Sequence, residues 1–274
     1  MEKPDIDHLR QWIGRGAEAR DLVTERLVQS LNATLSRRQG GVPLGLHWCL
    51  APDFTATEDL APDGLPSRGG FLPPVPLPLR MWAGGRLEFH DAFRPGDAVT
   101  RISKVSDLTY KEGRSGPLCF VSMAHEYLTA RGPAVTERHD IVYRAAPKGP
   151  PPPAQPAGMP GPAWTTHVMA DAVLLFRYSA LTFNGHRIHF DRDYCRDEKG
   201  YESLLVHGPL QATFLMNFAA DIEGRMPRLF DYRALMPLYD GAEFSLNGAR
   251  SADGLTVWAA DRSGRPTMKA EVTW

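Results

Sequence analysis

Hydrophobic and polar positions follow two different periods along the chain, and each period predicts a different kind of element. Between residues 22 and 35, apolar side chains recur every three to four positions with charged side chains between them, which predicts an amphipathic helix. Residues 209–222 show the same spacing, and Pro209 suits the first turn of a helix. The sequence therefore predicts two main helices, one early and one late in the chain.

Shorter segments rich in β-branched and aromatic residues, bounded by turn signals, predict an antiparallel sheet. The signals include Arg94-Pro95-Gly96-Asp97 in the first part of the chain and Asp253-Gly254 in the second. One helix beside an antiparallel sheet is an α+β layout, and the pattern occurs twice. The predicted strands cover residues 85–90, 98–105, 118–128, 135–143, 173–181, 244–249, 255–260 and 267–273.

One segment between these two parts has a different composition. Residues 145–163 are nearly all Pro, Gly and Ala, a composition that excludes a helix interior or a central strand and favours an extended spacer. We therefore predict two halves, residues 1–144 and 164–274, joined by a linker. Each half has the length of a small domain.

Composition and charge narrow the class of protein. The 274 residues carry a formal net charge of -1, which gives no reason to expect a nucleic acid or an anionic membrane as a partner. The three cysteines, Cys49, Cys119 and Cys195, are odd in number and form no CxxC pair, so we expect reduced thiols. No signal peptide and no run of about 20 apolar residues is visible, which favours a cytoplasmic protein.

The densest polar cluster lies between two apolar elements. Asn184, His186, Arg187 and His189 fall within six residues, after the predicted strand 173–181, and Gly185 among them permits unusual backbone angles. Downstream, His207-Gly208 comes just before the predicted late helix. Free backbone N–H groups at a helix start stabilise a developing oxyanion, so the N–H of Gly208 is a candidate donor.

Other kinds of site fit the sequence less well. A metal site would use His186, His189 and Asp191, with Asp193 as a further ligand, but their spacing matches neither a helical nor a knuckle pattern. The chain contains no GxSxG, GxGxxG or GxxxxGK[ST] motif, which weakens the hydrolase and nucleotide-cofactor interpretations. Acid–base chemistry without a metal is therefore favoured.

The cluster resembles the MaoC-like hydratases, the hydratase-2 branch of the hot-dog superfamily. Their motif, Asp-x-Asn-Pro-x-His followed by His-Gly, corresponds to residues 184–189 and 207–208, with His189 in place and Asn184 where the family has Asp. The variant TFNGHRIHFDRDY resembles the itaconyl-CoA and mesaconyl-C4-CoA hydratase subgroup, which is related to 3-hydroxyacyl-thioester dehydratase type 2. GGFLPPVPLPLRMWAGGRLEF, KEGRSGPLCFV and HDIVYRAAP in the first half resemble the same subgroup.

The resemblance implies a double hot-dog fold, in which each half is a long helix wrapped by an antiparallel sheet. It implies that the C-terminal half is catalytic and that the N-terminal half shapes the substrate pocket. Met81 and Trp82 would then line the pocket, although core packing is the simpler interpretation for both. CoA would be part of the substrate, so no separate cofactor is expected, and homodimers are common in the superfamily.

The same resemblance suggests roles for individual residues. His189 would transfer the protons, Asn184 would orient the water by a hydrogen bond because an amide is no base, and Gly208 would hold the thioester oxygen. A substrate with a free carboxylate needs a cationic partner. The sequence leaves three candidates for that partner or for the CoA phosphates, namely Arg80, Arg114 and Arg187.

Three functions fit these features. The first is a hydratase acting on a branched C5-dicarboxylic acyl-CoA, converting itaconyl-CoA or mesaconyl-C4-CoA to citramalyl-CoA, as in itaconate degradation. The second is a 3-hydroxyacyl-thioester dehydratase of fatty-acid metabolism, and the third is a thioester-binding protein without catalysis. We favour the first because residues 182–191 look most similar to that subgroup.

Overall fold

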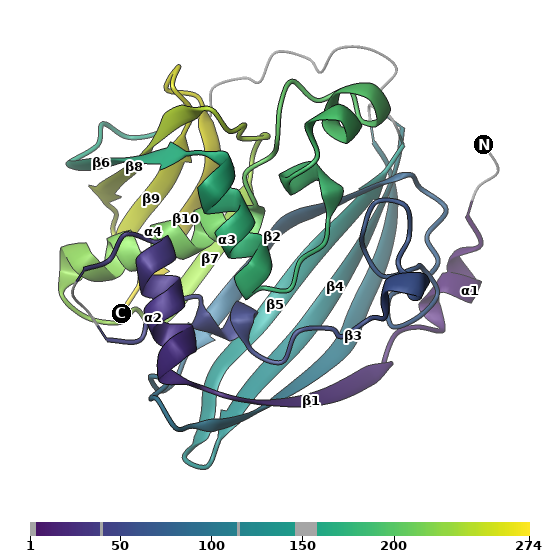
Figure 1. Ribbon diagram of the computed structural model, residues 1–274, viewed down its shortest axis with the longest axis horizontal. Helices are drawn as coiled ribbons and strands as arrows, with labels where there is room; N and C mark the ends of the chain where they lie inside the picture. Colours follow the sequence, from purple (N-terminus) through teal and green to yellow (C-terminus); the bar gives the residue numbers. More distant parts are fainter. Residues whose placement is uncertain (1–3, 39–40, 114–115, 146–157) are drawn as a thin grey trace.

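A computed structural model describes residues 4–38, 41–113, 116–145 and 158–274. Within these ranges ten strands form one antiparallel sheet in the order β1-β3-β4-β5-β2-β7-β10-β9-β8-β6 (Figure 1). Most of the predicted linker lies outside the described residues, and the division into two halves stays a prediction. The strands are β1 Gly16–Leu22, β2 Leu79–Phe89, β3 Ala98–Gly113, β4 Gly116–Thr129, β5 Gly132–Arg144, β6 Trp164–Ala170, β7 Leu229–Ala234, β8 Ala242–Arg250, β9 Leu255–Ala260 and β10 Pro266–Thr273.

The sheet joins the N-terminal and C-terminal strands at one seam, where β2 pairs with β7. Gly84 lies opposite Arg233 and Gly85 opposite Tyr232. A Cβ atom at Gly84 would lie 2.5 Å from the carbonyl oxygen of Tyr232, and one at Gly85 would lie 2.3 Å from that of Arg138. Glycine is required here because the neighbouring backbones come too close for any side chain.

The late helix is the central helix of the C-terminal half. This element, α4 (Gly208–Glu223), packs against β8, β9 and β10, and most of its side chains are buried (Figure 1). Its start and end agree closely with the prediction for residues 209–222. The early helix, α2 (Glu25–Thr34), is also confirmed, but it is shorter than predicted because the first predicted residue, Leu22, closes strand β1.

The predicted strand over residues 173–181 is wrong. These residues form α3 (Ala172–Leu181), which packs side by side with α2 (Figure 1). The segment is apolar nearly all round, so its periodicity does not separate a helix from a buried strand. The deciding signal is Asp171, whose side chain accepts a hydrogen bond from the N–H of Leu174 (2.8 Å) and caps the helix.

In the N-terminal half, a long and largely irregular segment contributes to the core. Residues 41–78 contain two short 3₁₀ helices, η1 (Leu46–Cys49) and η2 (Thr57–Asp59), and bury Leu46 and Leu77 in the core. The central helices of the two halves are therefore unequal, with 10 residues in α2 and 16 in α4. The remaining short helices are α1 (Ile6–Arg10), η3 (Arg187–His189) and the π-helical η4 (Tyr194–Glu198).

The cysteines and the helix lengths bear on two further expectations. We expected reduced thiols, and the structure has all three cysteines free; it also shows that all three are buried. In the described ranges, none of the helices combines the length and apolar character that a membrane span requires.

Candidate active site

The loop that carries the polar cluster begins at the end of a helix, not of a strand. At the end of α3 the backbone of Phe183 takes a left-handed conformation (φ 51°), and the N–H of Asn184 donates to the carbonyl of Ser179 (2.8 Å). This is a Schellman-type helix end, with phenylalanine at the position where glycine is usual. It turns the chain sharply, so that Asn184 faces the cavity described below.

The side chain of Asn184 is half-buried, and its oxygen already has a hydrogen-bond partner on the backbone. Its Oδ1 accepts a hydrogen bond from the N–H of His186 (2.9 Å). The amide therefore has its Nδ2 donors left for a water or a substrate. Gly185 does not have the unusual backbone angle that we expected; it is needed for close approach, because a Cβ atom there would lie 2.9 Å from the carbonyl oxygen of Gly64.

Two hydrogen bonds tie Ile188 and His189 to a neighbouring segment. The N–H of Leu205 donates to the carbonyl of Ile188 (2.9 Å), and Nδ1 of His189 lies 2.8 Å from the carbonyl oxygen of Leu205. A carbonyl only accepts, so Nδ1 carries the proton and Nε2 is left as a lone-pair acceptor. Burial lowers the pKa of His189 to about 4, and the residue remains 7% exposed, at the cavity. His189 is thus a neutral imidazole with a fixed tautomer, and its Nε2 is able to act as a base.

A second imidazole lies directly against this base. The ring of His207 stacks on that of His189 with centroids 3.6 Å apart and an angle of 18° between the planes. Nε2 of His207 shares a hydrogen bond of 2.7 Å with Oγ of Ser179. The ring of His186 meets His189 edge-on at 5.5 Å. Burial, together with the charges of His189 and Arg80, lowers the pKa of His186 to about 3.

Gly208 is the first residue of α4, immediately after His207. Its N–H belongs to the first turn, where backbone donors have no partner within the helix. The positive end of the helix dipole adds to their attraction for an anion. The indole of Trp82 covers the α-carbon, because a Cβ atom at Gly208 would lie 2.9 Å from Cε3 of that ring. The prediction that Gly208 offers an oxyanion donor is compatible with this geometry and stays a prediction.

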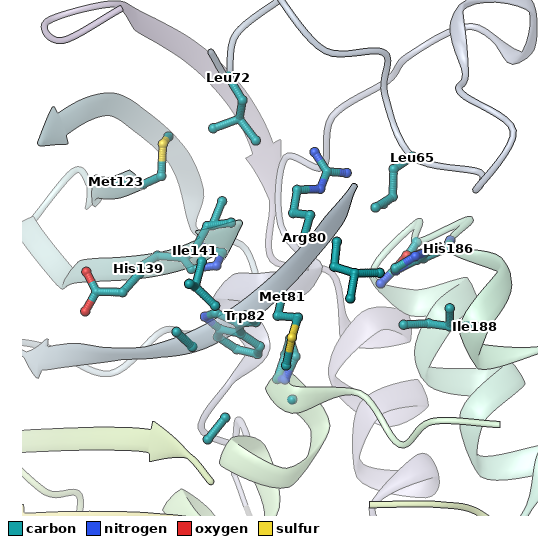
Figure 2. A pocket seen from close by; sticks show the side chains of 18 of the residues that line it. Leu65, Leu72, Arg80, Met81, Trp82, Met123, His139, Ile141, His186 and Ile188 are labelled. Atoms are coloured by element: carbon teal, nitrogen blue, oxygen red, sulfur yellow. Dashed lines mark hydrogen bonds between the residues drawn. The ribbon is translucent and has the colours of Figure 1, made fainter. Parts of the chain in front are cut away.

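One cavity of about 3550 Å³ extends from the C-terminal half into the N-terminal half and is lined by Asn184, His186, His189 and Gly208. His207 is fully buried and does not line it. Figure 2 shows the part near the cluster, with Met81 and Trp82 between the side chains of His186 and His139. Trp82 also packs into the core, with edge contacts to Trp48 and Tyr232 (5.1 and 5.4 Å between ring centroids) and a tilted contact to His139 (5.1 Å). Trp82 therefore both lines the cavity and packs in the core.

The three candidate arginines have different surroundings. Arg187 forms an ion pair with Asp191 (2.8 Å), donates to the carbonyl of Pro62 (3.1 Å) and stacks on Tyr194. Arg80 lines the cavity in Figure 2 and has no acidic side chain within 4 Å in the described part of the chain. Arg114 lies outside the described residues. Of the two candidates that the structure describes, Arg80 is therefore the one without an acidic partner.

The structure also adds residues that the sequence did not single out. Nε1 of Trp48 donates to the buried carboxyl of Glu137 (3.1 Å), and burial raises the pKa of that carboxyl to about 7. No local pattern links two residues that lie so far apart in the chain. Ser179 was part of the polar segment, but its bond to His207 depends on the fold. In the described ranges, no group of three or more His, Cys, Asp or Glu residues is placed to hold a metal ion.

Two solved structures show which fold class this arrangement belongs to. A MaoC-like dehydratase from Phytophthora capsici is 15% identical, with a TM-score of 0.72, and the match covers 98% of each chain. A Mycobacterium tuberculosis protein described as a double hot-dog fold is 14% identical, with a TM-score of 0.53, and the match covers 95% of each chain. The predicted α+β double hot-dog fold is therefore confirmed.

Sequence comparison then places the chain in a family. Residues 45–240 match the family model described as hydroxyacyl-thioester dehydratase type 2. A mesaconyl-C(4)-CoA hydratase from Chloroflexus aurantiacus is 38% identical over 269 residues, which cover 95% of this chain and 96% of the relative. The chain belongs to the hydroxyacyl-thioester dehydratase type 2 family.

Proposed function

We propose that this protein is a hydratase that adds water to the double bond of a short dicarboxylic acyl-CoA of the mesaconyl-C4-CoA type, giving citramalyl-CoA. One observation supports this type of reaction. Nδ1 of His189 donates to the Leu205 carbonyl, which leaves Nε2 as a neutral base in the cavity. The substrate class is supported by the 38% identity to a mesaconyl-C(4)-CoA hydratase over nearly the full length of both chains.

In this mechanism His189 carries out both proton transfers. Its Nε2 takes a proton from the attacking water while the water oxygen bonds to the β-carbon of the substrate. The imidazolium then gives that proton to the α-carbon, and the base returns to its neutral form. The pKa of about 4 keeps the free base neutral across the physiological range. The enolate that forms beside it favours the charged imidazolium during the reaction.

Asn184 orients the water in this scheme. Because its Oδ1 accepts from the N–H of His186, the amide meets the water as a donor. A water that accepts from Nδ2 of Asn184 and donates to Nε2 of His189 keeps one lone pair for attack. This arrangement explains how an amide serves at a position where the related hydratases have Asp.

The thioester oxygen becomes negative as water adds, and α4 supplies the stabilisation. The N–H of Gly208 and the positive end of this 16-residue helix face that charge in the proposed complex. Trp82 packs over the α-carbon of Gly208 and, in the proposed complex, shields that side of the donor from bulk water. The donor then acts at low dielectric, where its interaction with the oxyanion is strongest.

Arg80 is the residue we propose for the free carboxylate of the substrate. Burial lowers the pKa of His139 to about 4, and the charge of Arg80 acts in the same direction there, as it does on His186. Arg80 thus lies within electrostatic reach of both ends of the pocket in Figure 2. A guanidinium binds a carboxylate through two parallel hydrogen bonds, which favours a dicarboxylic over a neutral acyl group.

A spectrophotometric hydration assay with a small panel of unsaturated CoA esters tests the proposal. We expect a higher kcat/KM for mesaconyl-C4-CoA or itaconyl-CoA than for crotonyl-CoA, which lacks the carboxylate. Equal or better turnover of crotonyl-CoA would favour the second candidate, a 3-hydroxyacyl-thioester dehydratase. The match of residues 45–240 to the hydroxyacyl-thioester dehydratase type 2 family supports this dehydratase function.

The proposal includes a cytoplasmic homodimer that uses CoA only as part of its substrate. Val173 and Phe176 on α3 are 60% and 67% exposed, and adjacent apolar side chains on a surface support a subunit contact. Light scattering on the purified protein should give the mass of two chains. The mass of a single chain would contradict this part of the proposal.

A further inference from the structure

The stacked pair of imidazoles has a feature that simple core filling does not require. His207 is fully buried, and its Nδ1 has no hydrogen-bond partner among the described residues. An aromatic hydrocarbon such as phenylalanine would fill the same space without burying a polar atom. The imidazole contributes one thing that phenylalanine does not, namely the bond between its Nε2 and the hydroxyl of Ser179 (2.7 Å).

Ser179 connects the two sides of the active site. Its hydroxyl holds His207, whose ring lies against His189 at 3.6 Å. Its carbonyl accepts the N–H of Asn184 (2.8 Å), the residue proposed to orient the water. Ser179 is buried on α3, a regular helix capped at its start, so it is a rigid anchor. One residue therefore fixes both the base and the water-orienting amide.

We infer that Ser179 and His207 are positioning residues for the base: the hydroxyl of Ser179 fixes the ring of His207, and that ring fixes the plane of His189. The bond to Leu205 fixes one atom of His189 but leaves rotation about that bond free. The parallel stack removes this remaining freedom, so that Nε2 points to one place in the cavity. This inference rests on the proposed function, in which His189 is the base.

The electrostatics of the stack are consistent with such a role. Burial keeps the pKa of His207 well below its usual value, and the neighbouring His189 and His186 lower it further. His207 therefore stays neutral when His189 takes a proton during the reaction. The face of a neutral aromatic ring next to an imidazolium is a favourable contact, whereas a second cation would repel it.

The experiment compares Ser179→Ala and His207→Phe, alone and combined, with the wild-type protein. Each variant removes the Ser179–His207 bond, and His207→Phe keeps an aromatic ring in the stack. The matched control is Ser245→Ala, which removes a serine hydroxyl that accepts a side-chain hydrogen bond (from Nδ2 of Asn247, 2.8 Å) on β8, away from the cavity.

For Ser179→Ala we expect a fall in kcat of about 10- to 100-fold with little change in KM, because misplacing a catalytic group by about 1 Å costs on this scale. The double variant should lose no more than either single one, since both break the same link. An unchanged kcat, or an equal loss in Ser245→Ala, would overturn the inference. So would additive losses in the double variant.

A second measurement needs no substrate. In ¹⁵N spectra of labelled protein, wild-type His189 should show the Nδ1–H tautomer and stay neutral below pH 6. In Ser179→Ala its pKa should rise toward 6.5 as the ring loosens and gains water. If the wild type hydrates none of the esters, the proposed function fails while this spectrum still tests the positioning. An unchanged His189 signal in Ser179→Ala would overturn the positioning itself.

Discussion

Replacement of Gly208 by alanine is a direct test of the proposed oxyanion donor. The new Cβ atom would lie 2.9 Å from Cε3 of Trp82 and 3.6 Å from Cδ2 and Cζ3. Carbon atoms pack at about 3.5–4.0 Å, so the closest contact is short by roughly 0.6 Å or more. Either the indole or the start of α4 must therefore move.

The indole is the less movable of the two. Its contacts with Trp48, Tyr232 and His139 hold it from several sides, and Trp48 is tied to Glu137. We therefore expect the first turn of α4 to shift and to carry the N–H of residue 208 with it. Loss of one oxyanion donor costs about 10²–10³ in kcat, and overpacking of this kind costs about 1–3 kcal/mol of stability.

The measurement is kcat for mesaconyl-C4-CoA hydration together with the thermal midpoint of the same preparation. Trp82→Leu, which makes room for the methyl group, is the partner for a double-mutant cycle. We expect Gly208→Ala to lose about 100-fold in kcat in the wild-type background and clearly less in the Trp82→Leu background. Wild-type kcat in Gly208→Ala, with or without a change in midpoint, would refute the reasoning.

Three further predictions follow from the same geometry. Asn184→Ala should lower kcat by about 10- to 100-fold in the hydration assay because the water loses its donor; an unchanged kcat would mean that the water is held elsewhere. Arg80→Ala should raise KM for mesaconyl-C4-CoA while leaving crotonyl-CoA turnover unchanged, and an equal effect on both esters would contradict the carboxylate contact. Acid should destabilise the fold, because burial lowers the pKa of His47 to about 3 and of His189 to about 4, while both titrate near 6.5 when unfolded. Below pH 6.5 the unfolded chain binds protons that the folded chain does not, so stability falls as pH falls, by up to about 1.4 kcal/mol per pH unit for each such histidine. Thermal midpoints between pH 7 and 5 check this, with His47→Gln expected to weaken the dependence; a midpoint that is independent of pH would contradict it.

Elements with a clear period could be predicted from the sequence, and those without one could not. The helix at residues 209–222 and the strands at 118–128 and 267–273 have strong patterns and were predicted within a few residues. The edge strands β1 and β6 are mostly exposed on both faces, so their sequences lack the alternation that marks a half-buried strand. The prediction for residues 173–181, which form α3, was wrong for a different reason: the segment is apolar nearly all round, so it shows no clear helical period.

The active-site cluster was visible in the sequence only in part. His189 and Asn184 lie close together in the chain, and their density and motif could be recognised. The link from Ser179 to His207 spans 28 residues and the pair Trp48–Glu137 spans 89, so neither has a local signature. The free charge of Arg80, in contrast to the paired charge of Arg187, likewise depends on neighbours that only the fold brings together.

Nε2 of His189 is the proposed base, and the variant His189→Asn removes it. The asparagine amide can still donate to the Leu205 carbonyl in place of Nδ1, whereas the group at the position of Nε2 is removed. With mesaconyl-C4-CoA we expect kcat to fall by at least about 10³ while the thermal midpoint stays near that of the wild type. A folded His189→Asn variant that retains a tenth or more of the wild-type kcat would contradict the claim.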